Sequence, residues 1–158
     1  MHAEKRVLPY TPAQLFDLVA DVEKYPAFLP WCLAVRVRHR EIVETTVGGE
    51  ELLVADMAIG FKVFRESFTT RVQCRRPDRI DVTYTDGPFR YLNNHWVFSP
   101  KGDNACEIDF FVDFEFRSTI LQKAIGLVFN EAVKKMVDAF QARAEALYGP
   151  SDKSPSSR

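Results

Sequence analysis

The strict two-residue alternation of residues 106–116 constrains the fold of this chain more than any other feature. Apolar side chains occupy every second position, and acidic side chains lie between most of them, as expected for a strand that buries one face. The period then changes at Ser118, a favourable N-cap, to that of an amphipathic helix. We expect this helix to continue to about Tyr148, a length of about 45 Å, before Gly149-Pro150 ends it. The alternating positions are Cys106, Ile108, Phe110, Val112, Phe114 and Phe116 on the apolar side and Glu107, Asp109, Asp113 and Glu115 on the acidic side.

Six shorter segments upstream also have the period of strands: residues 2–8, 33–38, 51–59, 64–72, 80–84 and 92–98. Turn residues separate them at 48–49, 75–78, 86–88 and 101–104. Between the first two strands, Thr11 followed by Pro12 and Gln14 predicts the start of a helix. Residues 25–31 contain two prolines among large apolar side chains, which predicts a compact turn packed on the sheet.

This order of elements predicts an α+β domain of the helix-grip kind, in which a seven-stranded antiparallel sheet curves around the long C-terminal helix. Strands joined by short turns are antiparallel, and a sheet of this width twists and curls. One helix cannot fill the whole concave face, so the space that remains is the default ligand site. A solid core without a useful cavity is the alternative, and periodicity does not separate the two.

The inward apolar positions then supply the candidate lining of the cavity. Thirteen phenylalanines provide enough large apolar surface for a core and for a cavity wall. Two candidates come from the compact turn and the others from strands and the long helix: Phe28, Trp31, Phe64, Phe68, Leu92, Trp96, Phe110, Val112, Phe129, Val133 and Met136.

Composition excludes several other classes of protein. The formal net charge of −1 gives no overall attraction to DNA, and no apolar run approaches the length of a transmembrane helix. The N-terminus lacks the pattern of a signal peptide, which favours a cytoplasmic location in a bacterium. Cys32, Cys74 and Cys106 are far apart and odd in number, so we expect reduced, buried thiols and no disulfide framework.

Residues for catalysis are missing from the sequence. His2, His39 and His95 lack the spacing of metal ligands, and no nucleophile elbow, phosphate-binding loop or dinucleotide fingerprint is present. The acidic row of residues 107–115 is typical of a solvated strand face. We therefore expect no catalytic residues, no metal and no cofactor.

A basic cluster offers a candidate docking surface. Alternation places Arg36, Arg38 and Arg40 on one side of their strand, opposite its apolar residues. A solvated strand face is the simpler interpretation. The functional alternative is docking on lipid headgroups at a membrane or on the RNA of the large ribosomal subunit.

The segment Asp21-Val22-Glu23-Lys24-Tyr25-Pro26-Ala27-Phe28-Leu29-Pro30-Trp31-Cys32 resembles the hallmark of the coenzyme Q-binding START-domain family. That family belongs to the polyketide cyclase/dehydrase and lipid-transport superfamily, which includes ribosome association toxins. Weaker similarities are Gly87-Pro88-Phe89, residues 112–116 and residues 136–140. The likeness extends from residue 2 to about 149. We expect residues 1–149 to be one START-like lipid-binding domain, followed by a disordered polar tail at 150–158.

The resemblance implies a helix-grip fold and non-enzymatic binding of ubiquinone or a related isoprenoid lipid in support of respiration, with loose attachment to the inner membrane. It also permits a second interpretation, a ribosome-binding factor that blocks subunit association. A small-molecule cyclase or hydratase of the wider superfamily is a third, disfavoured by the missing polar residues.

Overall fold

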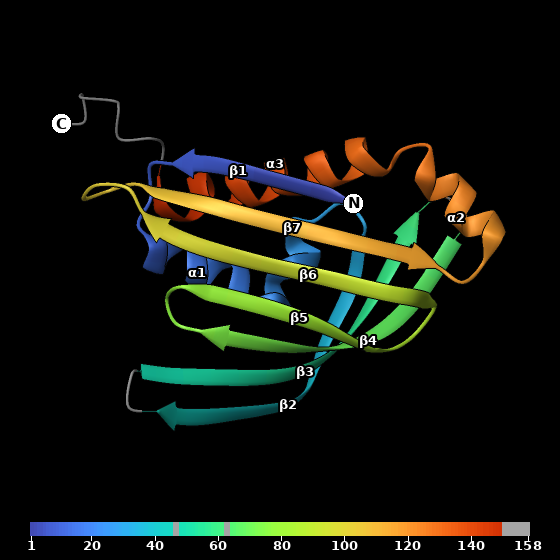
Figure 1. Cartoon of the computed structure of the whole chain (residues 1–158), viewed down its shortest axis with the longest axis horizontal. Helices are drawn as coiled ribbons and strands as arrows, with labels where there is room; N and C mark the ends of the chain where they lie inside the picture. Colours follow the sequence, from blue (N-terminus) through green and yellow to red (C-terminus); the bar gives the residue numbers. More distant parts are fainter. Residues whose placement is uncertain (46–47, 62–63, 150–158) are drawn as a thin grey trace.

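The computed structural model describes residues 1–45, 48–61 and 64–149. It describes the side chains of these residues except those at 43–48 and 61–64. One antiparallel sheet has the strand order β1-β7-β6-β5-β4-β3-β2, which confirms the predicted α+β class (Figure 1). Its strands are β1 (His2–Leu8), β2 (Cys32–Thr45), β3 (Gly48–Phe61), β4 (Phe64–Arg75), β5 (Arg79–Asp86), β6 (Phe89–Pro100) and β7 (Cys106–Phe116). The helices are α1 (Pro12–Ala20), the 3-10 helix η1 (Val22–Ala27), α2 (Thr119–Gly126) and α3 (Phe129–Tyr148).

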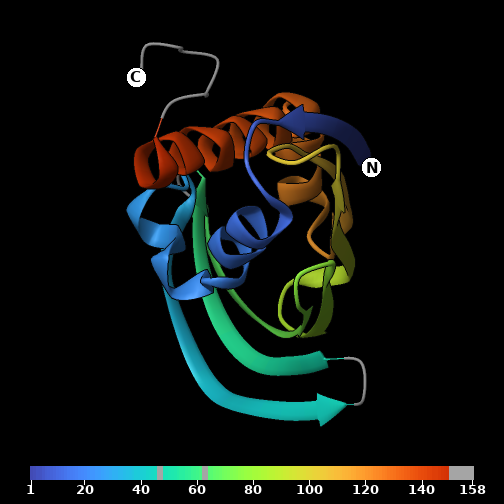
Figure 2. The ribbon, with the colours of Figure 1, turned by 90° about the vertical axis from the view of Figure 1, so that its left-hand side faces the viewer.

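The sheet curls into a trough, and α3 lies across its open side (Figure 2). Strands β2 and β3 bend most strongly. Two shifts in the ladder between them, at Cys32/Ala34 and at Val37/His39, mark β-bulges, which sharpen the local bend and twist. Curvature of this kind separates the centre of the sheet from the helix that covers it.

Helix α1 fills one end of the trough (Figure 2). Its start follows the prediction, because the Thr11 hydroxyl accepts from the Gln14 amide and the Gln14 side chain accepts from the Thr11 amide. Leu15 and Phe16 are buried, and the Phe16 ring meets Phe98 of β6 edge-on at 6.0 Å between centroids. This end of the trough is therefore solid core.

The single C-terminal helix predicted from the sequence is wrong in one respect: it is broken at residues 127–128. The Val128 amide donates to the Ile125 carbonyl, only three residues back, and the helix restarts as the Val128 carbonyl accepts from Ala132. Gly126, a weak helix former, precedes the break. The break lets α2 turn over the end of β7 (Figure 1), where the Gln122 side chain accepts from the Phe116 amide at 2.8 Å.

Two further predictions concern the glycine pair at 48–49 and the C-terminal tail. Gly48 and Gly49 pair with Thr45 and Glu44 in the ladder, so the prediction that the glycines themselves form the turn is wrong. The tail at 150–158, predicted to be polar and disordered, lies outside the described residues.

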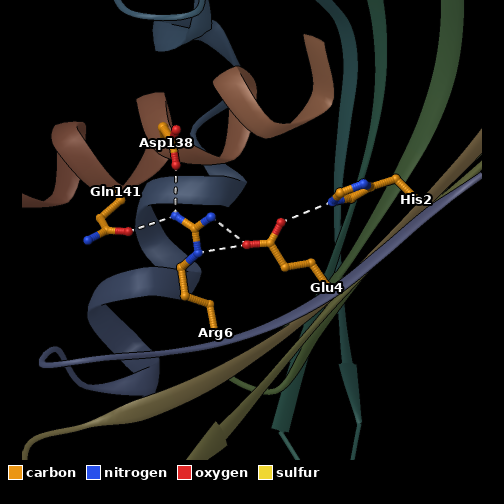
Figure 3. A network of polar contacts seen from close by, with 5 residues as sticks. All are labelled: His2, Glu4, Arg6, Asp138 and Gln141. Carbon is orange, nitrogen blue, oxygen red and sulfur yellow. Dashed lines mark hydrogen bonds and ion pairs between the residues drawn. The ribbon is translucent and has the colours of Figure 1, made fainter. Parts of the chain in front are cut away.

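A polar network fastens α3 to the edge strand β1 (Figure 3). The Arg6 guanidinium donates to the Asp138 carboxylate at 3.1 Å and to the Gln141 side chain at 2.7 Å, both on α3. Glu4 holds Arg6 in place by accepting from its Nε at 2.7 Å, and His2 contacts the other carboxylate oxygen at 3.0 Å. Burial alone would raise the pKa of Glu4, but the hydrogen bonds from His2 and Arg6 outweigh it and hold the pKa below 4.5.

We predict that Glu4→Gln lowers the free energy of unfolding by about 1–2 kcal/mol at pH 7, because a charged hydrogen bond to Arg6 is weakened. The folded-state pKa of Glu4 lies below its unfolded value, so this stability is complete above pH 4.5 and is lost as the pH falls. Urea unfolding from pH 7 to pH 3 should show the wild-type and variant curves converging below about pH 4.5.

Glu115→Gln is the matched control, because Glu115 pairs with Arg90 at 3.2 Å on the exposed face of the sheet. It should cost well under 1 kcal/mol. Equal losses from the two substitutions would contradict a clamping role for the network.

Candidate ligand-binding cavity

An apolar cavity of about 260 Å³ lies between the concave face of the sheet and helices α2 and α3. Side chains from strands β3 to β7, from η1 and from both helices line it. Almost all of these side chains are aliphatic or aromatic. The solid-core alternative left open by the sequence therefore does not describe this part of the molecule.

The structure brings most of the predicted lining residues together. Phe28 lies outside the lining and packs instead on Phe140, with ring centroids 5.2 Å apart. The side chain of Phe64 is outside the described residues. The predicted residues that line the cavity are Trp31, Phe68, Leu92, Trp96, Phe110, Val112, Phe129, Val133 and Met136.

The cavity extends along the strands from an aromatic end to an end beside α2. At the aromatic end, the Trp96 ring packs against Phe110 and Phe140, with centroids 4.5 Å and 4.9 Å apart. At the other end the lining includes Trp31 and Glu66 together with side chains of α2. The aromatic cluster closes one end, so we place ligand entry at the α2 end.

Exposed apolar side chains lie around the α2 end. Ile120 on α2 is 72% exposed, and Leu127 at the helix break is 88% exposed. Leu33 is 47% exposed and packs against Gly60, which lines the cavity. Exposed apolar surface therefore borders the α2 end of the cavity.

Sequence reasoning missed three polar members of the lining, Glu66, Thr70 and Asn94. A signal for the last two was present, because each interrupts an apolar series that faces inward. Thr70 lies between Phe68 and Val72 in the alternation of β4, and Asn94 lies between Leu92 and Trp96 in that of β6. A polar residue at an inward position of an otherwise apolar strand face marks such a site.

The predicted row of Arg36, Arg38 and Arg40 is interrupted by a β-bulge. The ladder between β2 and β3 shifts register between Val37 and His39, which leaves Arg38 as the inserted residue. An insertion of one residue reverses which of the following side chains face the concave side. The prediction that all three arginines share one side is therefore wrong for Arg40.

Arg40 lies on the concave side and has a structural role. Its ladder partner is the buried Leu53, and its guanidinium donates to Glu51 at 2.6 Å and meets Glu23 of η1 at 3.4 Å. It thereby ties η1 to β3. Arg36 remains exposed on the convex face.

The two halves of the convex face differ in their excess charge. The β2–β4 half carries five exposed arginines beside two carboxylates, Glu50 and Asp56, and the β7 half carries the acidic row predicted from the sequence. We call the basic half the arginine face, defined as Arg36, Arg38, Arg65, Arg71 and Arg75.

Groups for chemistry are sparse in the part of the chain that the structure describes. No cluster of three or more His, Cys, Asp or Glu side chains suits a metal ion there. The three cysteines are free and buried, as predicted, and burial raises the pKa of Cys74 to about 12. His95 stacks on Phe111 at 5.2 Å on the convex face, away from the cavity. None of the described helices is long and apolar enough to span a membrane.

Comparison with known proteins gives two kinds of relative. Ribosome association toxin RatA of Rickettsia prowazekii is 38% identical over 144 residues, covering 89% of this chain and 92% of the relative. Coenzyme Q-binding protein COQ10 homolog B of Xenopus laevis, a mitochondrial protein, is 32% identical over 152 residues, covering 94% of this chain and 59% of the relative.

Solved structures confirm the helix-grip fold. The 18 kDa protein CC1736 from Caulobacter crescentus has a TM-score of 0.74 at 39% identity, covering 94% of this chain and 98% of the other. A START superfamily protein from Mycobacterium smegmatis, at 15% identity, shows likeness of fold alone, with a TM-score of 0.71 and coverage of 92% and 97%. The family model described as polyketide cyclase/dehydrase and lipid transport matches residues 8–141. The chain therefore belongs to the polyketide cyclase/dehydrase and lipid transport family, as the START-domain resemblance of its sequence implied.

Proposed function

We propose that this protein binds an elongated apolar lipid in its cavity without transforming it, and that it acts in association with ribosomes. The cavity is the observation that carries the first part. Its walls are apolar, and a lipid buried there gains about 0.8 kcal/mol for each CH2 group removed from water.

The lining supports binding over catalysis. Catalysis of acyl, glycosyl or proton transfer needs a nucleophile or base with an orienting partner. Among the described residues of the lining, Glu66 is the one carboxylate, and none is His, Cys, Lys or Arg. The phenol of Tyr25, the remaining titratable group, donates to the Val19 carbonyl, and burial raises its pKa.

An isoprenoid lipid such as ubiquinone is the ligand class that we favour. The 32% identity to a coenzyme Q-binding protein supports it, and so does the apolar lining of the cavity, which extends along several strands. Support for a role in respiration is weaker than the sequence resemblance implied, because several relatives of higher identity are called ribosome association toxins. We therefore place ribosome association ahead of respiration.

The arginine face is the surface that we assign to the ribosome. RNA binding depends on cations that neutralise phosphates, and the convex half formed by β2–β4 presents five arginines on one side of the molecule. Its ion pairs are loose: Arg38 lies 3.4 Å from Asp56 and Arg75 lies 3.5 Å from Glu50. The large ribosomal subunit is the partner that we propose.

Val133→Trp tests the cavity. Val133 is buried and lines the cavity, so the larger ring should occupy the void and exclude the lipid. We expect retention of a short-tailed ubiquinone to fall at least tenfold, while the free energy of unfolding changes by no more than about 1 kcal/mol. Fluorescence titration and thermal unfolding of the same preparation measure the two effects.

Val137→Trp is the matched control for this substitution. Val137 lies one turn further along α3 and is equally buried, but it borders a space of only about 20 Å³. The same substitution there is overpacking and should cost about 1–3 kcal/mol or more. A Val133 variant as unstable as the Val137 variant, from a wild-type protein that binds no quinone, would show that the cavity does not take a lipid.

Removal of the Arg36, Arg38 and Arg71 charges tests the arginine face. The triple change to Gln should reduce co-sedimentation with large ribosomal subunits at least tenfold. In a plot of the logarithm of the binding constant against the logarithm of the salt concentration, the slope should also become less steep by about one for each phosphate that is no longer neutralised. The melting temperature should hardly change, because exposed charges contribute little to stability.

Two controls separate this surface from net charge and from fold. Changing Lys123, Lys134 and Lys135 to Gln removes the same charge from exposed positions on α2 and α3 and should leave co-sedimentation intact. Arg40→Gln removes an arginine that faces the concave side and should also leave it intact. A loss of binding in the lysine variant equal to that in the arginine variant would contradict the assignment.

A further inference from the structure

The polar groups of the cavity are few and lie in a definite order along it. Glu66 and Thr70 are both on β4, four residues and therefore about 13 Å apart along the strand. Thr70 pairs with Tyr84 of β5, and Asn94 pairs with Val82, one inward position further along β5. The order from the α2 end to the aromatic end is thus Glu66, Thr70 and Asn94.

Thr70 is a buried polar residue in the wall of a mostly apolar cavity. Its side chain is 3% exposed, and it is the only polar residue among the described ones that is fully buried. No hydrogen bond of its hydroxyl is found among the described side chains, although it lines an apolar cavity. The hydroxyl borders the cavity, where a ligand that hydrogen-bonds to it would gain free energy.

Asn94 is held in position with hydrogen-bonding capacity left over. Its Nδ2 donates to the Phe111 carbonyl of β7 at 2.9 Å, which fixes the amide against the sheet. The amide retains one N–H and its carbonyl oxygen, and Asn94 lines the cavity next to the Trp96 cluster. The closed end therefore offers a positioned donor and acceptor. The Thr70 hydroxyl lies one inward position away along the strands, toward α2.

The charge of the lining disfavours an anionic headgroup at this end. A carboxylate or phosphate buried among apolar side chains requires a cation or several donors. The lining, as far as the structure describes it, contains no Lys, Arg or His, and its carboxylate, Glu66, lies at the α2 end where a ligand enters. A fatty acid or a phospholipid would meet neither a counter-ion nor a favourable potential.

We infer that the ligand is an uncharged amphipathic lipid with a carbonyl or hydroxyl group, and that it enters with this group first. The polar group hydrogen-bonds with Thr70 and Asn94 near the closed end, and the hydrocarbon tail extends past Phe68 toward α2. This inference rests on the proposed binding of an apolar lipid and adds its class and its orientation.

Three probes of similar size and different headgroup test it: farnesol, which carries a hydroxyl; farnesene, a hydrocarbon; and farnesoic acid, an anion at pH 8. Wild-type protein should bind farnesol about tenfold more tightly than farnesene, and the acid more weakly than either. Thr70→Val keeps the shape and removes the hydroxyl. It should weaken farnesol binding about three- to tenfold, leave farnesene binding unchanged and leave the melting temperature of the free protein equal or higher.

Thr69→Val is the matched control, because the Thr69 hydroxyl donates to Asp56 at 2.6 Å on the convex face. It should not change the ratio of farnesol to farnesene affinity. Glu66→Gln should not change it either, because Glu66 lies beside the tail.

Each possible failure has its own signature in these titrations. Failure of wild-type protein to bind any of the three probes would defeat the proposed lipid binding itself. Binding in which the Thr70→Val protein keeps the wild-type ratio would overturn the headgroup site. A ratio lost in Glu66→Gln and kept in Thr70→Val would reverse the orientation, and acid bound as tightly as farnesol would refute the uncharged class.

Discussion

The structure depends on one contact, that of the apolar face of α3 with the open side of a curved sheet. The helix buries Val133, Val137 and Phe140 against the sheet. The bulges of β2 increase the curvature, and an apolar cavity remains between the helix and the concave face. A flat sheet would pack against the same helix without a void. The cavity is therefore a consequence of curvature, and its apolar lining is the ordinary inner face of an amphipathic sheet.

Helices α2 and α3, which cover the open side of the sheet, differ in how they are held. The β1 network and the solid packing of α1 fix α3 toward its C-terminus, where Arg6 bonds Asp138 and Gln141. At the other end, the break at residues 127–128 leaves α2 as a short separate helix with exposed apolar side chains. A ligand path that opens beside α2 leaves the network and the α1 core intact. The contacts of α3 with β1 and α1 would then maintain the fold, and the α2 end, which has fewer polar contacts, is suited to entry of a ligand.

Much of this architecture follows from local patterns in the sequence. The alternation of β7 predicted that strand, and the capping box at Thr11 predicted the start of α1, because each depends on neighbouring positions alone. The bulge at Arg38 and the break after Gly126 were missed, since each is set by a partner strand or by the end of the sheet. Most of the residues predicted to line the cavity do line it, because inward alternation and the apolar face of the helix identified them. The size of the cavity was not predicted, because curvature is a property of the whole sheet.

The lipid held by the protein as purified is the measurement that tests most directly whether the cavity takes an uncharged lipid. Native mass spectrometry of freshly purified protein, followed by organic extraction and identification of what is released, requires no assumption about the ligand. We expect one uncharged lipid per chain, with a long hydrocarbon portion and a single carbonyl- or hydroxyl-bearing end. A protein that is saturated with phospholipid or fatty acid, or one that is empty and accepts no apolar probe, would contradict this expectation.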